Sequence, residues 1–293
     1  MSATPNPNRK KVTTSTLRAK KARGEPITML TAYDFPTAQA IDRAGIDAIL
    51  VGDSLGMVVL GYDTTLPVTM EDMLHHCKAV ARGASTAHLI GDMPFMSYQV
   101  SEAEAVRNAG RFLQEAGMDA IKLEGGRGMV PTISAIVAAG IPVMGHIGLT
   151  PQSVHQLGGF KTQGKSAEAA RALVADAHAL EAAGCYALVL EAIPDRLAEL
   201  ISQRLTIPTI GIGAGSGSDG QVLVTYDLLG LFDGFTPKFV KQYAALHAEM
   251  ARAFGAYRED VLTHHFPAAE HSTPMDDQAF RELLTLLETE PIA

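Results

Sequence analysis

Short apolar runs alternate with longer amphipathic segments from residue 27 to about residue 230. The apolar runs contain few polar positions, which is typical of parallel strands that are covered on both faces. They lie at residues 27–33, 48–52, 88–93, 120–125, 142–148, 187–192 and 208–215. An eighth run, residues 221–229, fits a strand and a helix equally well.

The segments between these runs are rich in Ala and have the periodicity of amphipathic helices. Several of them end in Gly directly before the next run, where Gly commonly stops a helix. They span residues 35–45, 101–117, 132–140, 166–184 and 195–205. The alternation predicts repeated β-then-α units and therefore a parallel sheet.

A sheet of this kind either closes into a (β/α)8 barrel or stays open as a doubly wound sheet. Polar groups follow many different strands, whereas an open sheet concentrates its site at one switch point. We therefore predict an α/β fold of the TIM-barrel type.

The two ends of the chain differ from the repeats. Residues 1–14 are polar and predict a flexible tail, and a short helix follows with Thr14 or Ser15 as its predicted N-cap. Residues 15–270 predict a single barrel domain with a C-terminal helix, which the pattern starts at residue 237. Residues 271–293 form a predicted C-terminal extension with a last helix.

Charge and composition narrow the class of protein. The net charge is −8 and the basic run at residues 8–11 is short, so neither nucleic acid nor an anionic membrane is an expected partner. The sequence has no apolar stretch of membrane-spanning length and no secretion signal. The isolated cysteines, Cys77 and Cys185, favour a reducing cytoplasm.

Four strand candidates end in a carboxylate, at Asp53, Asp92, Glu124 and Glu191. Strand alternation places Lys122 and Glu124 on the face toward the barrel axis, because Ile121 and Leu123 belong against the helices. Carboxylates that share one barrel mouth repel one another unless a cation joins them. Oxygen ligands suit Mg²⁺ or a similar divalent ion, so we predict a metal site at the mouth.

Structural roles compete with this interpretation. A strand-end Asp or Glu can simply cap the following helix. His146 ends another strand and is either a core histidine or an accessory catalytic group, and Tyr33 and Asp34 either line the mouth or cap a helix. Residues 215–220 spell G-x-G-x-x-G, but so late in the chain this favours close backbone approach of a ligand, or a plain turn, over dinucleotide binding.

Eight motifs, in this order, resemble the ketopantoate hydroxymethyltransferase family from about residue 12 to about residue 270: LTAYDFPTA, LVGDSLGMVVLGYDTTLPVT, GDMPFMSY, IKLEGG, GHIGLTPQSV, GGFKTQGK, LVLEAIP and IGIGAGSGSDGQVLV. The resemblance implies a (β/α)8 barrel of the phosphoenolpyruvate/pyruvate type. It implies transfer of a hydroxymethyl group from 5,10-methylenetetrahydrofolate to 3-methyl-2-oxobutanoate, giving 2-dehydropantoate for pantothenate and coenzyme A. It also implies a homo-oligomer, a decamer in bacterial members.

The resemblance further implies site roles. Asp53, Asp92 and Glu124 match residues that bind one Mg²⁺ per subunit. Asp53, Ser54, Asp92 and Lys122 match residues around the keto acid, and Glu191 matches the proton acceptor.

Two alternatives stay open. One is another metal-dependent carbon–carbon bond lyase of the same barrel type acting on a 2-oxo acid, which a folate requirement would exclude. The other is a non-catalytic barrel, which the presence of every metal carboxylate disfavours.

Overall fold

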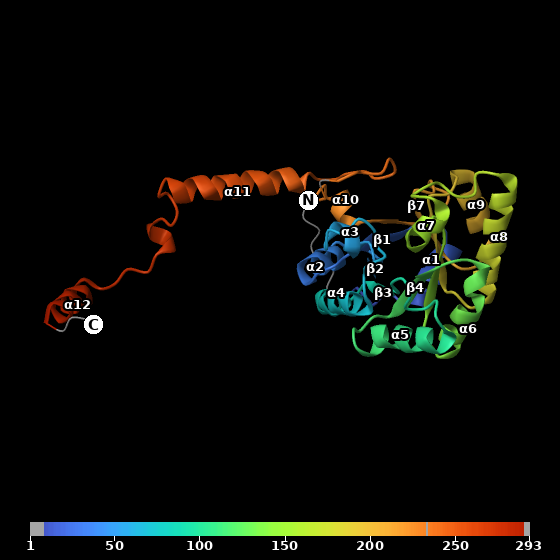
Figure 1. Cartoon of the computed structure of the whole chain (residues 1–293), viewed down its shortest axis with the longest axis horizontal. Coiled ribbons are helices and arrows are strands. Elements are labelled where there is room, and N and C mark those ends of the chain that lie inside the picture. Colours follow the sequence, from blue (N-terminus) through green and yellow to red (C-terminus); the bar gives the residue numbers. More distant parts are fainter. Residues whose placement is uncertain (1–8, 233, 290–293) are drawn as a thin grey trace. The chain divides into compact units, whose positions relative to one another are not determined.

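The computed structural model describes residues 9–232 and 234–289. In this part of the chain eight parallel strands close into a barrel in sequence order, as predicted (Figure 1). The strands are β1 (Ile27–Thr31), β2 (Ala48–Val51), β3 (His88–Asp92), β4 (Ala120–Glu124), β5 (Val143–Gly148), β6 (Ala187–Glu191), β7 (Thr209–Ile212) and β8 (Gly220–Leu223). By internal contacts the chain divides into two units, residues 1–243 and residues 244–293.

Alternate strand residues form two separate apolar clusters. One lies inside the barrel and includes Met29, Ile90 and Met144. The other, which includes Ile121 and Leu123, packs between the strands and the helices. The prediction that these two residues face the helices is therefore confirmed.

Helices follow most of the strands and cover the outside of the barrel. They are α2 (Phe35–Arg43), α4 (Met70–Gly83), α5 (Glu102–Gln114), α6 (Val130–Ala138), α8 (Ala167–Ala182) and α9 (Asp195–Arg204). Four of them begin with a side-chain cap, from Asp34, Thr69, Ser101 and Ser166. The shorter elements on the loops are α3 (Leu55–Val58), η1 (Arg127–Met129), η2 (Pro151–Ser153) and α7 (Val154–Leu157).

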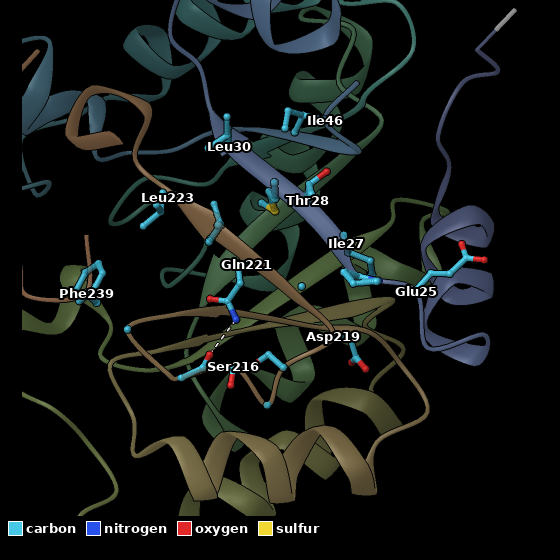
Figure 2. Close-up of a pocket in the computed structure, with 18 of the residues that line it drawn as sticks. Glu25, Ile27, Thr28, Leu30, Ile46, Ser216, Asp219, Gln221, Leu223 and Phe239 are labelled. Atoms are coloured by element: carbon cyan, nitrogen blue, oxygen red, sulfur yellow. Dashed lines mark hydrogen bonds between the residues drawn. The ribbon is translucent and has the colours of Figure 1, made fainter. Parts of the chain in front are cut away.

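The eighth β-then-α unit is incomplete within residues 1–243. The run 221–229 divides into β8 and the single turn α10 (Thr225–Leu228), so it is part strand and part helix. A cavity of about 1040 Å³ is lined by residues of β1, β8 and the β7–β8 loop (Figure 2). Gln221 lines it and donates to the Gly215 carbonyl over 2.9 Å.

Residues 9–13 are bound to the barrel, so the prediction of a flexible tail is wrong for them. The Val12 amide donates to the Thr86 carbonyl over 2.7 Å, and Lys11 pairs with Asp119 at 2.7 Å. Residues 1–8 of the predicted tail lie outside the described residues.

The first helix, α1 (Thr14–Ala22), is capped by Thr13 and not by the predicted Thr14 or Ser15. Its Lys20 and Lys21 each reach a carboxylate at 2.7 Å, Asp47 before β2 and Asp219 before β8. Because both partners precede strands, α1 lies at the N-terminal end of the barrel.

The second unit contains α11 (Leu246–Leu262), η3 (Ala269–His271) and α12 (Asp277–Thr289). The predicted start of α11 at residue 237 is wrong, because the Tyr243 amide bonds to the Leu228 carbonyl over 2.8 Å instead of to a helical turn. No helix in the described ranges is long and apolar enough to cross a membrane. The domain limits 15–270 and 271–293 stay predictions.

Candidate active site

The strand-end residues predicted from the sequence meet at the C-terminal end of the barrel. Asp92 lies opposite Lys122 in the β3–β4 register, and Glu124 lies opposite His146 in the β4–β5 register. Glu191 ends β6 beside Gly148 at the end of β5. Asp53 follows β2, and its amide donates to Asp92 Oδ2 over 3.2 Å.

Lys122 is the central cation of a buried acidic cluster formed by Asp53, Asp92 and Glu124. Its Nζ lies 2.7 Å from Asp92 Oδ1 and 3.8 Å from Glu124 Oε1, and all three side chains are at most 5% exposed. Burial acts to lower the pKa of Lys122, but the carboxylates outweigh it and raise that pKa above its ordinary value. The lysine is therefore charged.

Its charge does not balance the cluster. Burial, with Asp92 and Glu124 adding to it, raises the pKa of Asp53 well above its ordinary value. The pKa of Asp92 is also raised, mainly by burial, although Lys122 opposes the shift. Three carboxyl groups thus lie around one lysine, and burial disfavours the charged forms of Asp53 and Asp92.

His146 bridges this cluster to Glu191. Its Nδ1 lies 3.5 Å from Glu124 Oε1, and its Nε2 lies 3.2 Å from Glu191 Oε2. These are ion-pair distances, because neither ring nitrogen makes a well-aligned hydrogen bond with a described residue. Burial and Lys122 lower the pKa of His146, but the two carboxylates raise it to about 9 overall, so the ring is an imidazolium at neutral pH.

Glu191 differs from the other carboxylates in exposure. Its side chain is 18% exposed, against 3% for Glu124 and 2% for Asp92. It therefore contacts the cluster through His146 and still faces the space above the barrel.

The capping alternative fails for all four carboxylates. The helices that follow Glu124 and Glu191, η1 with α6 and α9, begin without a side-chain cap. Helix α5, which follows Asp92, is capped by Ser101, and α3, which follows Asp53, has no side-chain cap. Asp34 does cap α2, through a 2.8 Å bond from the Thr37 amide. Tyr33 is buried and shares a 2.9 Å hydrogen bond with Ser54, so it lies beside the site.

Two residues that were not predicted from the sequence, Gln152 and Tyr98, also contact the cluster. Gln152 Nε2 lies 2.9 Å from Asp53 Oδ2, and the Tyr98 hydroxyl accepts a 3.1 Å bond from the Glu124 amide. Both residues lie on loops that follow strands, at the same end of the barrel as the cluster. This location is the one signal in the sequence that could have identified them as site residues.

The glycine-rich stretch packs closely on α9. A side chain at Gly215 would collide with Asp195 of α9, and one at Gly217 would meet the Glu199 Cβ at 2.5 Å. The stretch also lines the cavity beside β1 and β8, so the alternatives of a ligand-approach loop and a plain turn both stay predictions.

The residues fit a divalent cation in charge and donor type. Asp53, Asp92 and Glu124 supply hard oxygen donors, and a single lysine lies among their three carboxyl groups. Within residues 9–232 and 234–289, no three His, Cys, Asp or Glu side chains already stand in a metal-binding arrangement. The argument that a divalent cation fits this site therefore rests on the charge and the donor atoms of the three carboxyl groups.

Solved structures with low identity share the fold. A phosphonopyruvate hydrolase complexed with oxalate and Mg²⁺ aligns with a TM-score of 0.59 at 15% identity, over 96% of this chain and 99% of that one. A 2,3-dimethylmalate lyase of the PEP mutase/isocitrate lyase superfamily aligns with a TM-score of 0.58 at 16% identity, over 94% and 95%. These structures share the barrel fold with this chain, which agrees with its closed eight-stranded topology.

Sequence relatives are much closer. The 3-methyl-2-oxobutanoate hydroxymethyltransferase of Syntrophomonas wolfei is 57% identical over 273 residues, 93% of this chain and 99% of the relative. That of Moorella thermoacetica is 59% identical over 264 residues, 90% and 98% of the two chains. The family model of ketopantoate hydroxymethyltransferase matches residues 11–269. With the motifs in order and the strand-end carboxylates gathered at one barrel mouth, this chain belongs to the ketopantoate hydroxymethyltransferase family.

Proposed function

We propose that this chain transfers a hydroxymethyl group from 5,10-methylenetetrahydrofolate to 3-methyl-2-oxobutanoate, giving 2-dehydropantoate in pantothenate biosynthesis. The observation that carries the proposal is the division of labour among the carboxylates. Three of them form a buried anionic cluster around Lys122, and Glu191 stands apart and more exposed. Relatives at 57% and 59% identity are 3-methyl-2-oxobutanoate hydroxymethyltransferases, which supports the same reaction.

The buried cluster binds the 2-oxo acid. Asp53, Asp92 and Glu124 would hold Mg²⁺, which when bound supplies Lewis-acid polarisation of the keto group. The charge of Lys122 compensates the substrate carboxylate. The Ser54 hydroxyl donates a hydrogen bond to the same carboxylate. Tyr33 orients that hydroxyl through the 2.9 Å bond between the two side chains.

Glu191 accepts the proton from C3 of the keto acid. Removal of this proton leaves an enolate. Water cleaves the methylene carbon from the two folate nitrogens at the oxidation level of formaldehyde and leaves tetrahydrofolate. C3 of the enolate bonds to that carbon, and the resulting alkoxide takes up a proton to give the hydroxymethyl group. His146, placed between Glu191 and Glu124, keeps the Glu191 carboxylate oriented and separates it from the cluster. Proton transfer of this kind contributes roughly 10²–10⁴-fold to a rate.

The substitution Glu191→Gln tests these roles because it keeps the shape of the side chain and removes its basicity. We expect the variant to bind Mg²⁺ and keto acid like the wild type. Exchange of the C3 proton with deuterium, followed by NMR, and turnover should each fall by roughly 10²-fold or more. Glu168→Gln, the same change on an exposed part of α8, is the matched control.

Exchange at near wild-type rate in Glu191→Gln would contradict the role of Glu191 as the base. Turnover of the keto acid without any folate would instead favour a lyase of the same barrel type.

The chain also functions as a homo-oligomer in the cytoplasm, and a decamer is the assembly that the family resemblance implies. Apolar side chains that stay exposed on the second unit support assembly, among them Phe254, Tyr257, Phe280 and Leu286. Light scattering of the purified full chain measures the subunit number, and a monomeric mass would contradict this part of the proposal.

A further inference from the structure

Gln152 connects two of the buried carboxylates to the loop after β3. It lies in η2, after β5, and is 5% exposed. Its Nε2 donates to Asp53 Oδ2 and to the Met93 carbonyl, both over 2.9 Å. Its backbone amide donates to Glu124 Oε2 over 3.0 Å. One residue therefore bonds to two members of the acidic cluster.

The orientation of the Gln152 amide is determined by its partners. The Asp53 carboxylate and the Met93 carbonyl can only accept, so the NH₂ group must face them. Oε1 then faces Tyr98, whose hydroxyl donates to it over 2.8 Å. The same hydroxyl accepts from the Glu124 amide over 3.1 Å, which ties the Gln152 amide to the end of β4.

These bonds from Gln152 engage one oxygen of the Asp53 carboxylate and one of the Glu124 carboxylate, and they leave the second oxygen of each without a bond from Gln152. Gln152 bonds to Asp53 Oδ2 and to Glu124 Oε2. No described residue donates a hydrogen bond to Asp53 Oδ1. Glu124 Oε1 has only the longer ion-pair contacts, to Lys122 at 3.8 Å and to His146 at 3.5 Å.

We propose that Gln152 is a positioning residue that orients Asp53 and Glu124 toward a divalent cation, and that Tyr98 fixes the orientation of its amide. The inference rests on the proposed function, because it assumes that the carboxylates bind a metal ion. Residues that orient metal ligands in this way contribute roughly 10–100-fold to metal affinity.

The test is calorimetric titration of the full-length protein with Mg²⁺ alone, without substrate. Gln152→Met keeps the length of the side chain and removes its hydrogen bonds, so we expect the Kd for Mg²⁺ to rise roughly tenfold or more. Tyr98→Phe leaves Gln152 in place and removes one hydroxyl, so we expect a rise of roughly threefold. Gln114→Met, on an exposed position of α5, should match the wild type.

Metal affinity separates positioning from a purely structural role, which would lower the melting temperature and leave the Kd unchanged. A Kd within about twofold of wild type in folded Gln152→Met would overturn the inference and leave the proposed function standing. If Gln152→Met does not fold, an unchanged Kd in Tyr98→Phe overturns it. A wild type that binds no Mg²⁺ overturns both the inference and the metal site of the proposed function.

Discussion

Replacing Lys122 by Met removes the central cation of the acidic cluster and keeps an unbranched apolar side chain in its place. The pair that is lost is short and buried: Lys122 Nζ lies 2.7 Å from Asp92 Oδ1, and the side chains are 5% and 2% exposed. Removing one partner of such a pair costs about 3–5 kcal/mol, because it leaves a buried charge without compensation. We expect the free energy of unfolding to fall by that amount at pH 8.

The loss should depend on pH in a defined direction. The pKa of Asp53 and that of Asp92 are already raised by burial, and removal of the lysine raises them further. A carboxyl group whose folded pKa lies above its unfolded value stabilises the fold when protonated and loses that contribution as the pH rises through the folded pKa. The deficit of Lys122→Met should therefore shrink as the pH is lowered from 8 toward the ordinary carboxyl range.

Urea unfolding at several pH values, without divalent metal, measures the deficit. The matched control is Lys78→Met, because Lys78 is 44% exposed and lies 3.8 Å from Glu115. An exposed pair of this kind contributes about 0–1 kcal/mol. A deficit below about 1 kcal/mol for Lys122→Met, or one that grows as the pH falls, would refute the electrostatic account of the cluster.

Three further predictions concern other parts of the barrel. Asp42→Asn should destabilise the fold by about 1–3 kcal/mol at pH 7, since the carboxylate accepts bonds from Ser85, Thr86 and Ala87. Burial acts to raise the pKa of Asp42, but the hydrogen bonds from residues 85–87 hold it below its ordinary value. The difference in unfolding free energy between wild type and Asp42→Asn should therefore vanish as the pH falls through that lowered pKa. Gly148→Ala should lower the free energy of unfolding by about 1–3 kcal/mol, because the added Cβ would collide with the Glu191 carbonyl. The displaced Glu191 should also slow C3 proton exchange, and exchange at the wild-type rate would contradict this. Borohydride treatment with keto acid should leave Lys122 unmodified in mass spectrometry, because Asp92 and Glu124 keep it charged, and a trapped adduct would indicate an imine route.

The barrel and the acidic cluster could be predicted because both follow from short-range pattern. Apolar runs of strand length place Asp53, Asp92, Glu124 and Glu191 at equivalent ends of parallel strands, and the closed topology then brings them together. The orientation of Lys122 toward the barrel axis followed from the alternation of side chains along one strand.

Contacts between distant parts of the chain could not be predicted in this way. Gln152 lies 99 positions from Asp53, and no local pattern distinguishes it from other polar loop residues. The binding of Val12 to the loop at Thr86 and the late start of α11 are likewise decided by tertiary hydrogen bonds. The close packing of the glycine-rich stretch against α9 is another such contact.

The acidic cluster links stability and function through one electrostatic imbalance. Asp53, Asp92 and Glu124 are buried, and Lys122 compensates them only in part. A ligand that binds the folded state alone stabilises it by about 2.7 kcal/mol at a concentration of 100 times its Kd. A cation that neutralises the cluster should therefore raise the stability of the barrel as it prepares the site for an anionic keto acid. Burial makes the carboxylates of the cluster unfavourable when no cation pairs with them, and it also strengthens each charge interaction within the cluster. The barrel therefore keeps these carboxylates where their charge has the greatest effect on a bound substrate.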